Sequence, residues 1–135
     1  MDEDYVVWSD AYSVEFPELD EQHKKLVLIT NDLLMSSKDK SSFSKAALMI
    51  AFSDACKYAV THFETEEKYM KKSKFPDLKT HKKEHEDFLA KVTDAFNKFE
   101  VDEFGAIDLA IFLKKWLLNH IAVVDKQYSP YLKKL

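Results

Sequence analysis

The segment THKKEHEDF, residues 80–88, places His81 and His85 four residues apart between lysines and glutamates. Side chains at positions i and i+4 of an α-helix project from the same face, so the two imidazole rings would lie one turn apart. The same face continues through three apolar residues, Phe88, Val92 and Phe96. This spacing predicts an amphipathic helix over about 77–99 whose inner face begins with two histidines.

Three further stretches repeat apolar residues at helical spacing and predict helices over about 18–35, 43–72 and 104–124. Their predicted inner faces comprise Leu19, Leu26, Ile29 and Leu33 on the first, Ala51, Ala55, Tyr58, His62, Glu66 and Tyr69 on the second, and Leu109, Leu113, Trp116, His120 and Val124 on the third.

The chain contains one glycine and three prolines, which leaves few places for the tight turns of a sheet protein. Long helices with short connections fit better, and Pro76 suits the first turn of the 77–99 helix. We therefore predict an all-α fold, an up-down-up-down antiparallel four-helix bundle that forms one domain over residues 1–135. An N-terminal arm of about 18 residues would precede the bundle, and a short C-terminal tail, QYSPYLKKL, would follow it. The arm would be anchored by three aromatic side chains, Trp8, Tyr12 and Phe16.

Composition argues against several classes of function. With a net charge of −4 and no arginine, the chain lacks the basic surface typical of nucleic-acid-binding proteins. Its one glycine, Gly105, cannot supply the glycine-rich loop of a nucleotide-binding protein. The N-terminus lacks the parts of a signal peptide, and no apolar run approaches the ~18 residues of a membrane span. Cys56 is the single cysteine and can form no internal disulfide, so we expect a cytoplasmic protein.

All five histidines fall on predicted inner faces, and every predicted helix carries at least one. They are His23, His62, His81, His85 and His120. Buried imidazole rings need polar partners, so five satisfied core histidines would be an unusual coincidence. In an antiparallel bundle, the end of one helix lies beside the start of the next, which would gather the five rings toward one end.

Two carboxylates accompany these rings. Glu66 follows His62 at i+4 and shares its helical face. Asp125 follows His120 at i+5, a spacing that rotates the two side chains about 140° apart on an ideal helix. The last helix must therefore either end near Asp125 or contain a local bulge of the kind found at functional sites.

Five imidazoles and two carboxylates form a nitrogen and oxygen donor set without thiolate. Imidazole suits iron, copper, zinc and nickel, whereas the absence of cysteine ligands argues against structural zinc and iron–sulfur clusters. Seven groups are too many for one ion and suit two ions bridged by the carboxylates. If one oxygen atom also bridges, the five histidines divide three and two, and one metal keeps an open position for a small ligand.

At these residues the chain resembles the hemerythrin family, and its bacterial members in particular. The resemblance covers nearly the whole chain and is carried by four motifs in a fixed order. These are ELDEQHKKL with His23, HFETEE with His62 and Glu66, HKKEH with His81 and His85, and HIAVVD with His120 and Asp125. Each motif alone is a weak signal, but the combination of one His, HxxxE, HxxxH and HxxxxD is highly specific.

The resemblance implies a non-haem di-iron centre that binds O2 reversibly. By the family pattern, one iron would be held by His81, His85 and His120, and the iron with the open position by His23 and His62. Glu66 and Asp125 would bridge the two ions together with an oxo or hydroxo group.

Apolar residues near the predicted ligands resemble the family's O2 pocket, namely Leu26, Phe63, Trp116, Leu117 and Ile121. A dry pocket without a proton donor favours reversible binding over turnover. Tyr128 follows Asp125 by three residues, and it is equally well interpreted as a hydrogen-bond partner behind the ligands or as packing of the tail.

The leading hypothesis is a monomeric carrier, store or scavenger of O2 that is not an enzyme and whose protein partner the sequence does not identify. An oxygen or redox sensor acting through a partner is an alternative. A di-iron enzyme that reduces peroxide or nitric oxide is another, although enzymatic ferritin-like sites use more carboxylates and fewer histidines. A bundle whose histidines bind no metal is the fourth hypothesis, and it predicts that His85→Ala leaves stability unchanged or raises it.

Overall fold

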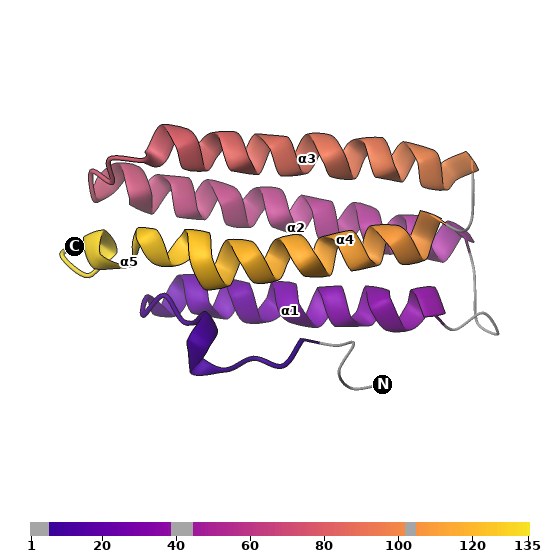
Figure 1. The fold of residues 1–135 in the computed structure, drawn as a ribbon, viewed down its shortest axis with the longest axis horizontal. Helices are drawn as coiled ribbons and strands as arrows, with labels where there is room; N and C mark the ends of the chain where they lie inside the picture. The colour runs from indigo at the N-terminus through magenta and orange to yellow at the C-terminus, as the bar shows by residue number, and fades with distance from the viewer. Residues whose placement is uncertain (1–5, 39–44, 102–104) are drawn as a thin grey trace.

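A computed structural model of the chain describes residues 6–38, 45–101 and 105–135. Within these ranges all regular secondary structure is helical, and four long helices dominate it (Figure 1). They are α1 (Pro17–Lys38), α2 (Lys45–Lys72), α3 (Leu78–Val101) and α4 (Gly105–Asn119). The helices run alternately up and down, which confirms the predicted all-α four-helix bundle.

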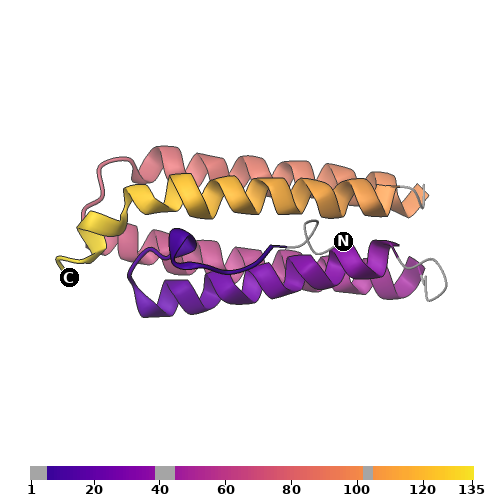
Figure 2. The ribbon, with the colours of Figure 1, turned by 60° about the horizontal axis from the view of Figure 1, so that its bottom comes forward.

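The four helices form two layers. α1 packs against α2 and α4, and α3 packs against the same two helices, so the bundle has a square cross-section. Figure 2 shows α3 and α4 in one layer and α1 and α2 in the other. The α2–α3 connection, the start of α1 and the end of α4 lie at the same end of the bundle (Figure 1). This end therefore receives the histidine-containing part of every helix.

The turn between α2 and α3 begins with a Schellman motif at the end of α2. Lys74 adopts a left-handed backbone conformation with φ 59°. Its N–H donates to the carbonyl of Lys71 at 3.2 Å, and the N–H of Phe75 donates to that of Met70 at 2.9 Å. Phe75 and Met70 are both buried in one apolar cluster, so the reversal of the chain is fixed by hydrogen bonds and by packing.

The predicted place of Pro76 is wrong. α3 begins at Leu78, so Pro76 lies in the turn and not in the first helical turn. The Schellman motif is followed by a turn in which the N–H of Leu78 donates to the Phe75 carbonyl at 3.4 Å, and the first helical hydrogen bond, from the N–H of His81, is accepted by the Asp77 carbonyl at 3.0 Å.

The chain stays helical beyond Asn119, the last residue of α4, but its hydrogen-bonding pattern changes. Residues His120–Val124 form a π-helical segment, η4, in which the N–H of Asp125 donates to the carbonyl of His120. Two short helices follow, η5 (Asp125–Gln127) and α5 (Ser129–Leu132). Of the two possibilities that the His120–Asp125 spacing left open, the structure takes the bulge.

The N-terminal arm lies along the bundle and includes a short helix, η2 (Asp10–Tyr12). Asn31 holds it at two points, accepting from the N–H of Val6 and donating to the Val6 carbonyl, both at 2.8 Å. Trp8 and Tyr12 contact each other with ring centroids 5.7 Å apart and are only half-buried, as is Phe16. Within the described part of the arm, from residue 6 on, the fully buried residues are Val6 and Val14, which the aromatic spacing did not single out.

The core consists of three apolar clusters along the bundle. One at the end near α5 comprises Val14, Leu19, Met70, Phe75, Tyr128 and Leu132. A second contains Val6, Leu26, Val27, Leu117 and Ile121. The third and largest includes Leu33, Phe52, Phe63, Phe88, Val92 and Leu109. None of the helices within the described residues is long and apolar enough to cross a membrane.

The inner face of α2 agrees with the prediction only in part, because His62 and Glu66 are buried as predicted but the other four residues are not fully buried. Ala51, Ala55, Tyr58 and Tyr69 are only half-buried, whereas Phe52, Ala59, Phe63 and Met70 are buried. The apolar residues of α2 surround more than half of its circumference over this stretch, so periodicity alone could not choose between neighbouring faces.

Candidate metal centre

The structure brings together all seven side chains that the sequence predicts as ligands. Every one of them is buried, with at most 3 % of its surface exposed. α1 supplies His23, α2 supplies His62 and Glu66, α3 supplies His81 and His85, and the α4–η4–η5 segment supplies His120 and Asp125.

The seven side chains form two overlapping sets, and within each set the potential ligand atoms lie within 4.8 Å of one another. The first set is Glu66, His81, His85, His120 and Asp125, and the second is His23, His62, Glu66 and Asp125. Both carboxylates belong to both sets, and the histidines divide three and two. This is the arrangement that two ions bridged by two carboxylates require.

In the first set, nitrogen and oxygen atoms converge at short distances. Asp125 Oδ1 lies 2.9 Å from His81 Nε2 and 2.8 Å from His120 Nε2. Glu66 Oε1 lies 3.3 Å from His85 Nε2. The Nε2 atoms of His85 and His120 face each other at 3.0 Å, an arrangement expected of two nitrogens directed at one point.

In the second set, the other oxygen of Asp125 takes part. Asp125 Oδ2 lies 3.0 Å from His23 Nε2, which is also 3.5 Å from Glu66 Oε2. His62 Nε2 lies 3.1 Å from Glu66 Oε1. The two oxygens of Asp125 therefore face different histidine groups, as the oxygens of a bridging carboxylate do.

Several of these buried atoms have no hydrogen-bond partner among the described residues. They include His23 Nε2, His62 Nε2, Glu66 Oε1 and Asp125 Oδ2. Buried polar atoms nearly always have partners, so such a cluster calls for an explanation. Imidazole nitrogen and carboxylate oxygen are the donors that first-row transition metals take in proteins, and cations between these atoms would satisfy them. The residues present therefore fit a metal pair.

Without metal, the buried carboxylates and rings shift each other's protonation. Burial lowers the pKa of His23, but the nearby carboxylates of Asp125 and Glu66 outweigh that effect and raise the pKa to about 9. Burial likewise opposes the effect of Asp125 and Glu66 on His120, whose pKa rises to about 10. Burial would raise the pKa of Glu66 and Asp125, yet the neighbouring histidines lower both pKa values well below the usual range.

Three further side chains contact the predicted ligands. Tyr128 is fully buried and donates to Glu66 Oε2 at 2.6 Å. It therefore is a hydrogen-bond partner behind a ligand and also packs the C-terminal tail against the bundle. Gln22 Oε1 lies 2.6 Å from His62 Nδ1, and Glu67 Oε2 lies 2.9 Å from His85 Nδ1. Sequence reasoning missed Gln22 and Glu67. Gln22 precedes His23 on α1 but contacts His62 on α2, and Glu67 follows Glu66 on α2 but contacts His85 on α3.

The five residues predicted to form the O2 pocket fall into two groups. Phe63 stacks on His85 with ring centroids 3.9 Å apart, and Trp116 stacks on His120 at 4.2 Å, so both cover the three-histidine set. Leu26, Leu117 and Ile121 pack together in the aliphatic cluster that includes Val6 and Val27.

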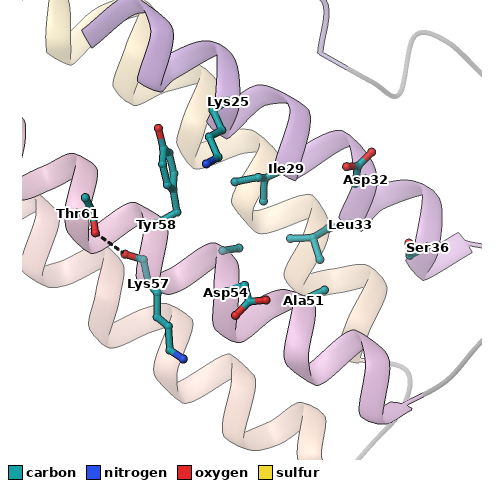
Figure 3. A pocket seen from close by; sticks show the side chains of 11 residues that line it. Lys25, Ile29, Asp32, Leu33, Ser36, Ala51, Asp54, Lys57, Tyr58 and Thr61 are labelled. Atoms are coloured by element: carbon teal, nitrogen blue, oxygen red, sulfur yellow. Dashed lines mark hydrogen bonds between the residues drawn. The ribbon is translucent and has the colours of Figure 1, made fainter. Parts of the chain in front are cut away.

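A groove on the surface between α1 and α2 has a volume of about 460 Å³ (Figure 3). It contains none of the predicted ligands and is lined by Lys25, Ile29, Asp32, Leu33, Ser36, Ala51, Asp54, Ala55, Lys57, Tyr58 and Thr61. Three of these residues, Ile29, Leu33 and Ala55, also line a cavity of about 30 Å³. Leu26 and Leu117 form part of the inner wall of that cavity, so groove and O2-pocket residues adjoin the same space.

The chain is similar to known proteins over most of its length. Residues 15–132 match the family model described as the hemerythrin HHE cation binding domain. The bacteriohemerythrin of Stenotrophomonas maltophilia is 28% identical over 95% of this chain and 82% of its own length. That of Methylococcus capsulatus is 33% identical over 84% of this chain and 85% of its own length. Myohemerythrin of Riftia pachyptila is 30% identical over 93% of this chain and 92% of its own length.

The likeness extends to three dimensions. The crystal structure of a wild-type hemerythrin superimposes with a TM-score of 0.82 at 29% identity, covering 94% of this chain and 97% of that one. The match of the family model spans all seven predicted ligands. The chain therefore belongs to the hemerythrin family.

Proposed function

We propose that this protein binds O2 reversibly at a non-haem di-iron centre and acts as a carrier, store or scavenger. The observation that carries the proposal is the pair of ligand sets that share Glu66 and Asp125 and divide the histidines three and two. Membership of the hemerythrin family, which binds non-haem iron, supports iron over the other metals that imidazole accepts.

The proposed assignment follows the oxygen atoms of Asp125. Oδ1 faces His81 and His120, which would hold one iron together with His85, and Oδ2 faces His23, which would hold the other together with His62. The second iron has fewer protein ligands and therefore the open position. When bound, the iron pair would supply two electrons and one coordination position for O2.

The surrounding residues favour binding over turnover. Phe63 stacks on His85 and also lies beside His62 of the two-histidine set, with ring centroids 6.0 Å apart, and Trp116 stacks on His120, so apolar rings adjoin both metal positions. Burial and the charges of Glu66 and Asp125 raise the pKa of Tyr128, so its hydroxyl stays protonated and holds Glu66 Oε2. A phenol that is fixed as a donor to a carboxylate is a poor source of protons for reduction of O2.

The experiment is a cycle of oxygenation on protein loaded with iron. Iron analysis should give two ions per chain, and the visible spectrum of the anaerobically reduced protein should change on adding O2 and return when O2 is removed. The same protein is then assayed for sustained turnover of peroxide and nitric oxide. Irreversible oxidation on the first exposure would reject reversible binding, and sustained turnover would reassign the site to an enzyme.

A further inference from the structure

Gln22 and Glu67 contact two of the predicted ligands on the side of the ring that faces away from the metal positions. Gln22 Oε1 lies 2.6 Å from Nδ1 of His62, which belongs to the two-histidine set. Glu67 Oε2 lies 2.9 Å from Nδ1 of His85, which belongs to the three-histidine set. Each metal position therefore has one histidine with an oxygen acceptor behind it.

The orientation of the Gln22 amide is determined by Thr65. The Thr65 hydroxyl donates to the backbone carbonyl of Thr61 at 3.0 Å, and a carbonyl can only accept. The same hydroxyl oxygen accepts from Gln22 Nε2 at 3.4 Å, so the amide oxygen is the atom that faces His62. In the neutral ring that can bind a metal, Nδ1 of His62 then carries the proton, and Nε2, 3.1 Å from Glu66 Oε1, keeps its lone pair.

Glu67 fixes the proton of His85 without an intermediary. A carboxylate has no proton to donate, so Nδ1 of His85 is the donor and Nε2 keeps the lone pair. The Glu67 side chain is 25% exposed, so it contacts solvent while one of its oxygens reaches the buried ring. By contrast, Nδ1 of His23 has no hydrogen-bond partner among the described residues.

We propose that Gln22 and Glu67 are positioning residues that hold His62 and His85 as Nδ1–H tautomers and thereby direct one Nε2 lone pair at each metal position. The inference rests on the proposed function only for the existence of two metal positions. The two metal positions should also differ in the charge that they stabilise, because the acceptor behind His62 is a neutral amide and the acceptor behind His85 is a carboxylate. A carboxylate behind an imidazole makes the ring a stronger donor, so the His85 position should stabilise a higher metal charge than the His62 position.

The first test uses Zn²⁺, which needs no O2 and no redox chemistry. Zn²⁺ is titrated against a competing chelator into the metal-free full chain and into Gln22→Leu and Glu67→Leu. Each substitution should lower the binding affinity for one of the two Zn²⁺ ions by about 10–100-fold. Glu64→Gln serves as the matched control, because Glu64 is an exposed glutamate on the same helix, and it should leave both affinities unchanged. Equal affinities in all four proteins would overturn the proposal.

The second test distinguishes positioning from a merely structural role. In Zn²⁺-loaded protein with ¹⁵N-labelled histidine, the downfield signal of the hydrogen-bonded Nδ1–H proton of His62 should move upfield in Gln22→Leu and stay in place in Gln22→Glu, which preserves the acceptor. Urea unfolding of the metal-free variants measures their effect on folding separately. A Gln22→Leu protein that is less stable but keeps the signal in place and the zinc affinity unchanged would contradict the proposal.

The third test addresses charge and uses iron. Glu67→Gln should raise the reduction potential of the iron pair, and Gln22→Glu should lower it. Shifts of the same sign, or no shifts, would overturn the proposed difference between the two positions. A protein that fails to bind O2 reversibly but shows the zinc and NMR results would reject the proposed function and leave the positioning role intact.

Discussion

At the scale of single residues, the site is a buried cluster of histidines and carboxylates that shift each other's protonation when no metal is bound. Glu66 and Asp125 are ionised, because neighbouring histidines outweigh the effect of burial on their pKa values. His23 and His120 carry the compensating protons, with pKa values of about 9 and about 10. Metal binding must displace these protons, since only the neutral ring coordinates.

Metal uptake should therefore release protons near neutral pH. At about pH 7, adding Zn²⁺ or Fe²⁺ to the metal-free protein should release close to two protons per chain from His23 and His120, and fewer as the pH rises through about 9 and about 10. A pH indicator in weakly buffered solution measures the release. A release that does not fall between neutral pH and pH above 10 would show that these rings are not protonated in the metal-free state.

The same shifts fix the sign of the pH dependence of folding. A raised histidine pKa contributes stability that is fully present below the unfolded value of 6.5 and is lost as pH rises through about 9 and about 10. The lowered carboxylate pKa values contribute stability that is present above their unfolded values and is lost in strong acid. Urea unfolding of the metal-free protein should therefore show a loss of stability on the alkaline side that the metal-loaded protein lacks.

His85→Ala separates a metal site from a core of unoccupied histidines. The substitution removes a ligand of the three-histidine set and the donor to Glu67. Iron content should fall, and the loaded protein should lose the free energy that metal binding adds to folding, about 3–4 kcal/mol when metal is at 100–1,000 times its dissociation constant. Iron analysis and calorimetry measure both effects. Lys82→Ala, at an exposed position on the same helix, is the control, and equal iron content in the two variants would contradict the metal assignment.

At the scale of helices, the sequence predicted the four long elements because their apolar residues recur at helical spacing over many turns. The His120–Asp125 spacing also carried the information that α4 is irregular, since two residues five apart can face one site only through a bulge. Other features depend on contacts between helices. Gln22 reaches His62 and Thr65 from α1, and no local pattern reveals which residues of two helices will lie at the same height.

α2 ends at Lys72, as the predicted range 43–72 has it, but the Schellman motif that follows could not be predicted, for a different reason. Glycine is the usual residue in the left-handed position of a Schellman motif, and here the position is occupied by Lys74. Lysine pays a steric cost there, which the hydrogen bonds of Phe75 and the burial of its ring offset. The motif is therefore visible in the backbone but not in the sequence.

Lys74→Gly should consequently stabilise the protein. Glycine removes the clash of the β-carbon, a gain of roughly 1–2 kcal/mol, and adds about 0.5–1 kcal/mol of entropy to the unfolded chain, so we expect a net gain of about 0.5–1 kcal/mol. Lys74→Ala, which keeps the β-carbon but removes the charge, should leave the free energy of unfolding nearly unchanged. Urea unfolding measures both variants, and a gain with alanine equal to that with glycine would assign the effect to charge.

At the scale of the whole molecule, the groove between α1 and α2 shares lining residues with a small cavity that two residues of the predicted O2 pocket, Leu26 and Leu117, also line. Ala55 lines both the groove and the small cavity, whereas Ala51 lines only the groove. If O2 enters here, Ala55→Phe should slow O2 association and dissociation by similar factors and leave their ratio unchanged, because it narrows the path without touching a ligand. Stopped-flow and flash-release kinetics measure the two rates. Ala51→Phe is the matched control, and unchanged rates in Ala55→Phe would place the entry elsewhere.

The position of the metal cluster within the bundle has a consequence for the stability of the two ends. The ligands come from the start of α1, the end of α2, the start of α3 and the end of α4, so the metals connect all four helices at one end only. The opposite end depends on the large apolar cluster around Phe52, Val92 and Leu109. Without metal, the ligand end contains buried polar atoms that lack partners, which weakens it relative to the apolar end.

Hydrogen exchange should therefore be faster at the ligand end than at the apolar end in the metal-free protein, and metal should affect the ligand end more. In metal-free protein, amides over residues 60–70 and 118–128 should exchange faster than those over 48–56 and 90–97, because the ligand end opens locally. Metal loading should slow exchange at the ligand end by much more than at the apolar end, since opening that end requires loss of the metals. His85→Ala, measured with and without metal, is the control and should show little of this change. An equal effect of metal on both ends would mean that the bundle opens only as a whole, and the site could not then stabilise one end independently of the other.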